Sequence, residues 1–119
     1  MRYQVDFVNP PNRFRHVGWT QVVDARGGRT VYIAGQVGLD VNGQVVGIDD
    51  FEAQARQTFH NSQVGLELVG LTFNHVVKLG MFITNFSHRT VLRKVRDEFV
   101  NTQNPPASTL VQVSALFMP

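Results

Sequence analysis

The sequence predicts an α+β fold in which two helices cover one face of a β-sheet. Three observations support this fold class. Runs rich in β-branched residues, which favour strands, are separated by a pair of glycines that favours a tight turn. Two later segments carry apolar residues at helical spacing, and each is followed by a further strand-like run. The resulting order is an initial hairpin followed by two helical crossovers, which is typical of a layered domain.

The first strands are expected near the N-terminus. An irregular lead-in with a short strand at residues 3–8 precedes two β-branched runs at residues 20–25 and 30–36. Gly27 and Gly28 lie between these runs, and glycine adopts the positive φ of a tight turn without steric cost. We therefore predict that the two runs pair as a hairpin.

The first helix has clear start and stop signals. Asp49 or Asp50 can cap its N-terminus, and Gly70 marks its end. Residues of one face recur at helical spacing, namely Phe51, Ala55, Phe59, Ser62, Leu66 and Val69. This pattern predicts a helix that buries one side.

The C-terminal half reads as strand, helix and strand. Strands are predicted at residues 76–84 and 109–116, and Ser87 is predicted to cap the helix between them. Arg93 and Asp97 on that helix are four residues apart and are expected to form an ion pair. Its narrow apolar stripe consists of Val91, Val95 and Phe99.

Two helices can cover only one face of the sheet. The other face is expected to show Val76, Phe82, Leu110 and Leu116. An uncovered apolar face favours association, so a partner subunit is the simplest cover. The alternative is that the lead-in folds over this face.

Composition narrows the class of protein. The 119 residues suit one domain, so we expect a single domain over residues 1–119. The absence of a secretion signal, and of any apolar run near the ~20 residues that cross a bilayer, predicts a cytoplasmic protein without membrane contact. Eleven basic against nine acidic residues are too evenly balanced to favour nucleic acid as a partner.

Several kinds of chemistry are absent from the sequence. There is no cysteine, which excludes disulfides, thiolate nucleophiles and cysteine metal sites. The four histidines lack the spacing of a metal site, and no glycine-rich phosphate loop is present. We therefore expect neither a metal nor a cofactor.

Four short segments follow one another in a distinctive order. They are Ala34-Gly35-Gln36, Ala53-Gln54-Ala55-Arg56-Gln57, Val76-Val77-Lys78 and Pro106-Ala107-Ser108-Thr109-Leu110-Val111. None is specific alone, but their joint order and spacing, over most of residues 19–116, resemble the RidA family. The resemblance implies a chorismate-mutase-like fold, a homotrimer whose sheets form a central β-barrel, and small-molecule clefts between adjacent subunits.

The resemblance also implies an activity. Active members of that family hydrolyse reactive imines and enamines to a 2-keto acid and ammonia. Such a site must hold the substrate carboxylate, place water at the imine carbon and balance charge as ammonia leaves. We therefore expect a hydrolase of the imine/enamine deaminase type. Two alternatives stay open: a trimer that binds a metabolite without turnover, and a partner of RNA or protein.

Position 108 departs from the family pattern. The last segment usually reads Pro-x-Arg-Ser in the family, and its arginine holds the substrate carboxylate through two charge-assisted hydrogen bonds. Ser108 stands there in this chain. A single hydroxyl gives up about 1–3 kcal/mol of ligand stabilisation, so an altered substrate is expected.

Five residues are the candidates for substrate binding. Arg93 is a candidate substitute for the missing cation, near a position where relatives have a pocket asparagine; a solvent-facing ion pair is the alternative. Trp19 matches a cleft tyrosine and suits stacking on a planar ligand, or else anchoring an interface. Gly35 permits close backbone approach to a ligand or a strand. Ser108 and Thr109 offer hydroxyls to a cleft, or are ordinary polar strand residues.

No catalytic residue is identified from the sequence. The resemblance implies one more strand after the Leu-x-x-Pro region, which carries a glutamate that positions water. Because the sequence ends at Pro119, we expect that strand and its glutamate to be absent.

Overall fold

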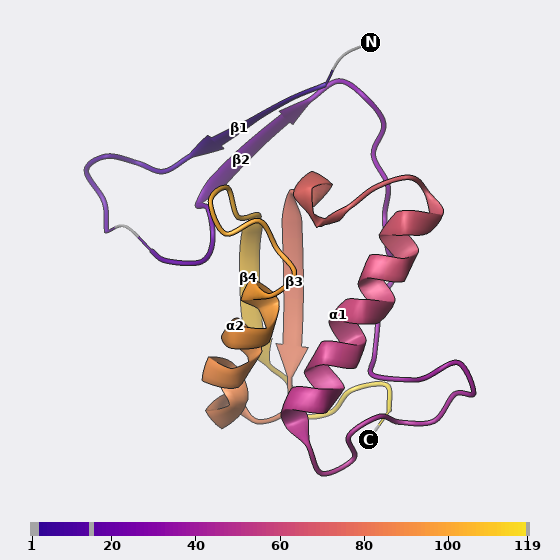
Figure 1. Ribbon diagram of the computed structural model, residues 1–119. Helices are drawn as coiled ribbons and strands as arrows, with labels where there is room; N and C mark the ends of the chain where they lie inside the picture. The colour runs from indigo at the N-terminus through magenta and orange to yellow at the C-terminus, as the bar shows by residue number, and fades with distance from the viewer. Residues whose placement is uncertain (1–2, 15, 119) are drawn as a thin grey trace.

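The computed structural model describes residues 3–14 and 16–118 and contains two helices and two small sheets (Figure 1). The elements in chain order are β1 (Gln4–Val8), β2 (Val22–Arg26), α1 (Phe51–Leu68), a 3₁₀ turn (Phe73–His75), β3 (Lys78–Ile83), a second 3₁₀ turn (Phe86–His88), α2 (Arg89–Asp97) and β4 (Ala107–Gln112). Within these described ranges, no helix combines the length and apolarity needed to cross a membrane. The α+β class predicted from the sequence is confirmed.

The predicted hairpin between residues 20–25 and 30–36 is wrong. β2 pairs instead with β1, antiparallel, so the strand predicted at residues 3–8 is confirmed. Gly27 and Gly28 do turn the chain, with φ of 74° and 67°. Residues 30–36 then run on without forming a strand, and the strands form two separate two-stranded sheets instead of one sheet.

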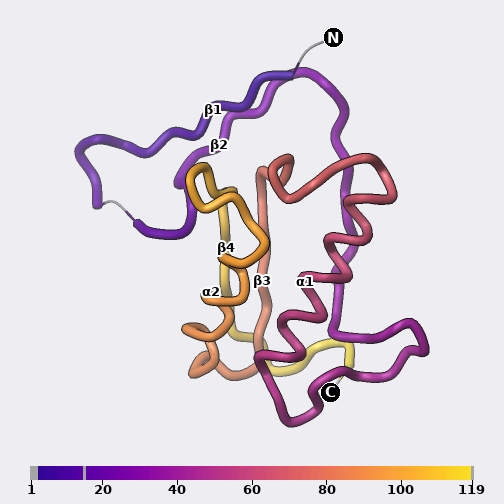
Figure 2. The backbone as a smooth tube through the Cα atoms, viewed as in Figure 1, coloured from indigo at the N-terminus to yellow at the C-terminus, as the bar shows by residue number. Residues whose placement is uncertain are grey.

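Contacts with α1 explain the path of residues 30–36 (Figure 2). Just before this segment, Arg29 donates a hydrogen bond to the carbonyl oxygen of Val69 at the end of α1. The side chain of Ile33 packs beside Gly65, and the Asn61 amide donates to the carbonyl oxygen of Val37 at 2.9 Å. These contacts hold the segment along the helix and away from β2.

Helix α1 follows its sequence signals closely. The carboxylate of Asp50 accepts a hydrogen bond from the backbone N–H of Ala53 at 3.1 Å, as an N-cap should. Gly70 has a φ of 76° just after the helix ends. The predicted face is buried at Ala55, Phe59 and Leu66.

The start of α2 differs from the prediction. Asn85 caps the 3₁₀ turn before the helix, because its side-chain oxygen accepts from the N–H of Ser87 at 3.0 Å and from the Ser87 hydroxyl at 2.7 Å, and α2 itself starts after His88 without a side-chain cap. Ser87 therefore lies inside a 3₁₀ turn that precedes the helix, and the predicted Ser87 cap is wrong. The predicted Arg93–Asp97 pair is also wrong, because Asp97 pairs with its neighbour Arg96 at 3.0 Å.

Both helices pack on one face of the parallel pair β3–β4. Side chains alternate along a strand, so Met81 and Ile83 of β3 point to the helices together with Leu110 of β4. Within this core, Phe59, Phe73 and Phe99 form an aromatic cluster with ring centroids 5.4–6.2 Å apart. Each such burial stabilises the fold by about 1.5–3 kcal/mol.

The opposite face of β3–β4 is bare in this chain. Phe82 is 59% exposed and Val111 is 38% exposed. The sequence expectation was right for Phe82, whereas Leu116, which is 40% exposed, lies beyond the end of β4 and belongs to neither strand. The expectation was wrong for Val76 and Leu110, which pack against the core, because strand alternation places Leu110 on the helix side.

Candidate functional site

Three sequence-predicted site residues meet in one small cavity. Trp19, Arg93 and Ser108 line a hollow of about 140 Å³ beside the sheet. Met81, Leu110 and Arg96 complete its lining. The cavity therefore combines an aromatic ring, a hydroxyl and two guanidinium groups over an apolar floor.

The parallel strands supply the floor of this cavity. Ser108 and Leu110 are two residues apart on β4, so their side chains point to the same, helix-facing side. Met81 of β3 is the register partner of Leu110. The serine thus lies at the β4 start, next to the two apolar residues.

Helix α2 and the loop before β2 supply the walls. Arg93 and Arg96 are three residues apart on α2 and so share a face. Thr20 fixes the loop that carries Trp19, because its N–H donates to the carbonyl oxygen of Pro106 at 3.2 Å and its hydroxyl to that of Pro105 at 2.5 Å. Thr20 is only 2% exposed, so its two hydrogen bonds are shielded from water and fix the position of the loop.

Arg96 is the site residue that the sequence analysis missed. It was not singled out from the sequence as a site residue, yet it is only 5% exposed. Its spacing carries a signal: it lies four residues after Leu92, which is buried, and next to Val95, which is fully buried. A charged residue in line with an apolar stripe indicates a buried cation.

The guanidinium of Arg96 has one partner among the described residues. Its Nε donates to the Asp97 carboxylate at 3.0 Å, and its two terminal nitrogens have no hydrogen-bond partner there. No fully buried side-chain polar atom in the same ranges lacks a partner. The terminal nitrogens are therefore not fully sealed from solvent, and the Arg96 side chain is part of the cavity lining.

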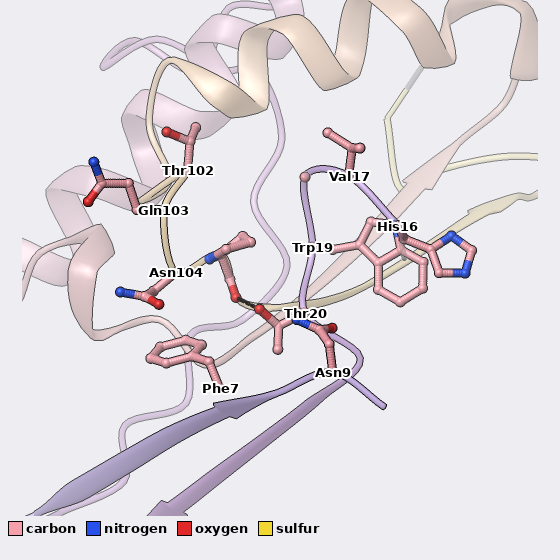
Figure 3. A pocket seen from close by; sticks show the side chains of 11 residues that line it. Phe7, Asn9, His16, Val17, Trp19, Thr20, Thr102, Gln103 and Asn104 are labelled. Atoms are coloured by element: carbon pink, nitrogen blue, oxygen red, sulfur yellow. Dashed lines mark hydrogen bonds between the residues drawn. The ribbon is translucent and has the colours of Figure 1, made fainter. Parts of the chain in front are cut away.

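A second, larger hollow shares the wall formed by Trp19 (Figure 3). It has a volume of about 310 Å³. The His16 ring stacks on the Trp19 indole at 4.3 Å between centroids, and Asn9 accepts a hydrogen bond from the N–H of Gln21 at 3.0 Å. Its other lining residues are Phe7, Val17, Gly18, Thr20, Thr102, Gln103, Asn104 and Pro105.

The other two predicted site residues lie elsewhere. Gly35 is exposed, and no heavy atom of the described residues lies within 4 Å of the position of a Cβ there. Thr109 is on the bare side of β4, where its hydroxyl accepts a hydrogen bond from Lys78 at 2.6 Å. Neither lines the cavity, and their part in ligand binding stays a prediction.

The shifted pKa values belong to an ion pair that does not line the cavity. A hydrogen bond from Arg56 lowers the pKa of Glu98, and the same bond raises the pKa of Arg56. The pair joins α1 to the residue after α2 through an Nη2–Oε2 distance of 2.6 Å. Its role is structural.

Among residues 3–14 and 16–118, no group of three or more histidine, aspartate or glutamate side chains is placed to hold a metal.

The fold and cavity together define a small α+β protein with an arginine-lined hollow beside a parallel strand pair. The model of the family described as endoribonuclease L-PSP matches residues 12–119, and the chain therefore belongs to that family, the RidA family. The resemblance inferred from the sequence is confirmed.

Two curated relatives, one from Dermatophagoides farinae and one from Homo sapiens, carry the same enzyme name. The mite Dermatophagoides farinae has a protein named 2-iminobutanoate/2-iminopropanoate deaminase, which is 32% identical over 83 residues. The match covers 70% of this chain and 65% of that enzyme, which is less than two thirds of its length.

Solved structures share the fold. A Yersinia pestis protein of the Rid family, YyfB, of unknown function, has a TM-score of 0.84 at 28% identity, covering 97% of this chain and 90% of that one. RidA from an Antarctic Psychrobacter species has a TM-score of 0.70 at 36% identity, covering 77% of this chain and 73% of that one.

Proposed function

We propose that the protein is a RidA-type hydrolase that converts a small imine or enamine to a keto compound and ammonia. The observation that carries this proposal is the meeting of Trp19, Arg93 and Ser108 in one cavity, although they come from three separate parts of the chain. The deaminase name of the mite relative supports the same reaction type.

The chemistry needs few groups. Water adds to the imine carbon, the nitrogen gains protons and leaves as ammonia, and the carbon keeps the oxygen as a keto group. The Ser108 hydroxyl can accept a hydrogen bond from that water or donate one to the imine substrate. The Trp19 ring offers a flat apolar wall to a planar imine. Positioning of this kind lowers the barrier without a covalent intermediate.

We further propose that three copies of the chain complete the site. The bare face of β3–β4 carries Gly80, Phe82 and Val111, and burying such a face in a shared barrel removes apolar surface from water. The clefts would then lie between neighbouring subunits, with the cavity of Trp19 and Ser108 on one side.

A non-catalytic role as a metabolite-binding trimer has one observation in its favour. The lining of the 140 Å³ cavity includes no carboxylate and no imidazole among the described residues. A protein that only binds its ligand needs no general base.

Turnover separates the two roles. A suitable imine is generated in place from an amino acid by an amino-acid oxidase, and keto acid and ammonia are followed over time. We expect the protein to speed their release over the buffer rate, and Ser108→Ala to slow it about 3–100-fold because one hydrogen bond is lost. Asn42→Ala, in the exposed turn between Leu39 and Val45, is the matched control. No acceleration by the wild-type protein over a panel of such imines would rule out the hydrolase.

A further inference from the structure

The guanidinium of Arg96 is buried and has a single hydrogen-bond partner among the described residues. Placing a charge in the interior costs several kcal/mol unless partners replace its water. Asp97, whose side chain is 44% exposed, is its one partner among the described residues and reaches only Nε. The terminal N–H groups of Arg96 have no acceptor among the described residues, and the side chain lines the cavity.

We propose that Arg96 binds the carboxylate of the ligand in the cavity formed with Trp19 and Ser108, and that Arg93 lines the same anionic subsite. The inference deepens the proposed function and rests on it for the location of the ligand. In the family pattern, an arginine at position 108 on the strand binds the carboxylate. In this chain that role passes to Arg96 on helix α2.

The local backbone keeps room for this guanidinium. Gly18 has a φ of 90°, a conformation that glycine adopts freely and other residues avoid. A Cβ at this position would collide with a terminal nitrogen of Arg96. The loop that carries Trp19 thus passes directly over the arginine, and its glycine lets the two lie in contact.

Ser108 fits the same arrangement. A long side chain on β4 at this position would project into a hollow of only about 140 Å³ and compete with Arg96 for it. Serine leaves that space open and offers a hydroxyl beside the two guanidiniums. The small residue on the strand and the buried arginine on the helix are therefore complementary.

Charge and size define the ligand class. Arg93, Arg96 and Asp97 sum to one positive charge, which suits a single carboxylate. The cavity is smaller than the roughly 300–1,000 Å³ of pockets for drug-sized ligands. The Trp19 ring favours a ligand with a planar group that can stack on it. The expected ligand is a small 2-imino or 2-keto monocarboxylate.

The test measures binding of two stable keto acids, pyruvate and 2-oxobutanoate, to the full chain. Trp19 is the only tryptophan, so its fluorescence reports directly on the cavity. We expect Arg96→Gln to weaken binding about 10–100-fold, the effect of losing a charge-assisted hydrogen-bond pair. Arg96→Lys should recover part of the loss, since lysine keeps the charge without the fork. Lys94→Gln, on the same helix with a side chain 67% exposed, is the matched control and should bind as wild type.

A second measurement uses only the wild-type protein, so it tests the inference even if the Arg96 variants do not fold. The wild-type protein should bind pyruvate at least tenfold more tightly than neutral pyruvamide, and added salt should weaken pyruvate binding only. A folded Arg96→Gln variant that binds keto acids as wild type does, or equal binding of pyruvate and pyruvamide, would overturn the inference. Absence of turnover together with Arg96-dependent binding would instead sink the hydrolase and leave this inference standing.

Discussion

At the residue scale, the site depends on a buried cation and on the glycine that contacts it. The Arg96 side chain is almost fully buried against Gly18 and beside Trp19 and Ser108. Neighbours from distant parts of the chain create this environment, and the local sequence signal for it is the position of Arg96 four residues after the buried Leu92. Ser108 was found because a family pattern marks its position, and Trp19 for the same reason.

Gly18→Ala tests the contact between the loop and Arg96. The alanine adopts the positive φ only with strain and pushes the guanidinium aside, so we expect a loss of about 1–3 kcal/mol in the free energy of unfolding. Denaturant unfolding measures this loss. Gly35→Ala is the control, because Gly35 lacks a positive φ and no described atom lies near its Cβ position. Equal stability of the two variants would show that Gly18 does not constrain Arg96.

At the scale of elements, the sequence predicted correctly those features that depend on neighbouring residues, such as the two ends of a helix. Helix α1 begins at an Asp50 cap and ends before Gly70, as its sequence indicates. The partner of β2 was missed, because strand pairing depends on contacts that lie far apart in sequence. Residues 30–36 have the composition of a strand, yet the packing of Ile33 beside Gly65 and the hydrogen bond from Asn61 to Val37, just after the segment, hold them along α1. The face of Leu110 was likewise decided by packing of α1 and α2 on the sheet.

The ion pair between Arg56 and Glu98 holds the two helical segments together, and it gives stability a dependence on pH. Because the hydrogen bond from Arg56 lowers the pKa of Glu98 from its ordinary value, the pair stabilises the fold above that value. The contribution is lost as pH falls through the lowered pKa. It is small, because both side chains are about two-fifths exposed.

We therefore expect Glu98→Gln to melt at a lower temperature than wild type at pH 7, with the difference shrinking as pH is lowered through the depressed pKa of Glu98. Thermal melts across this range measure it. Glu67→Gln is the control, because Glu67 forms no ion pair with a described residue. A difference between Glu98→Gln and wild type that stays constant with pH would contradict the assignment.

At the scale of the whole molecule, the chain has one covered and one bare face on its parallel strand pair. The two helices pack on one side, and Phe82 with Val111 faces outwards on the other. The same β4 strand contributes Ser108 to the cavity and Val111 to the bare face. Association through that face would therefore bring a neighbouring chain close to the site, which links assembly to activity.

The most direct test of this account is the molar mass of the wild-type protein in dilute buffer by sedimentation equilibrium, with Phe82→Asp as the comparison. We predict that the wild type sediments with the mass of three chains, and that the charged variant dissociates because an aspartate at the interface loses its water. A wild-type protein that is folded and sediments as single chains would contradict the claim that neighbouring subunits complete the cavity.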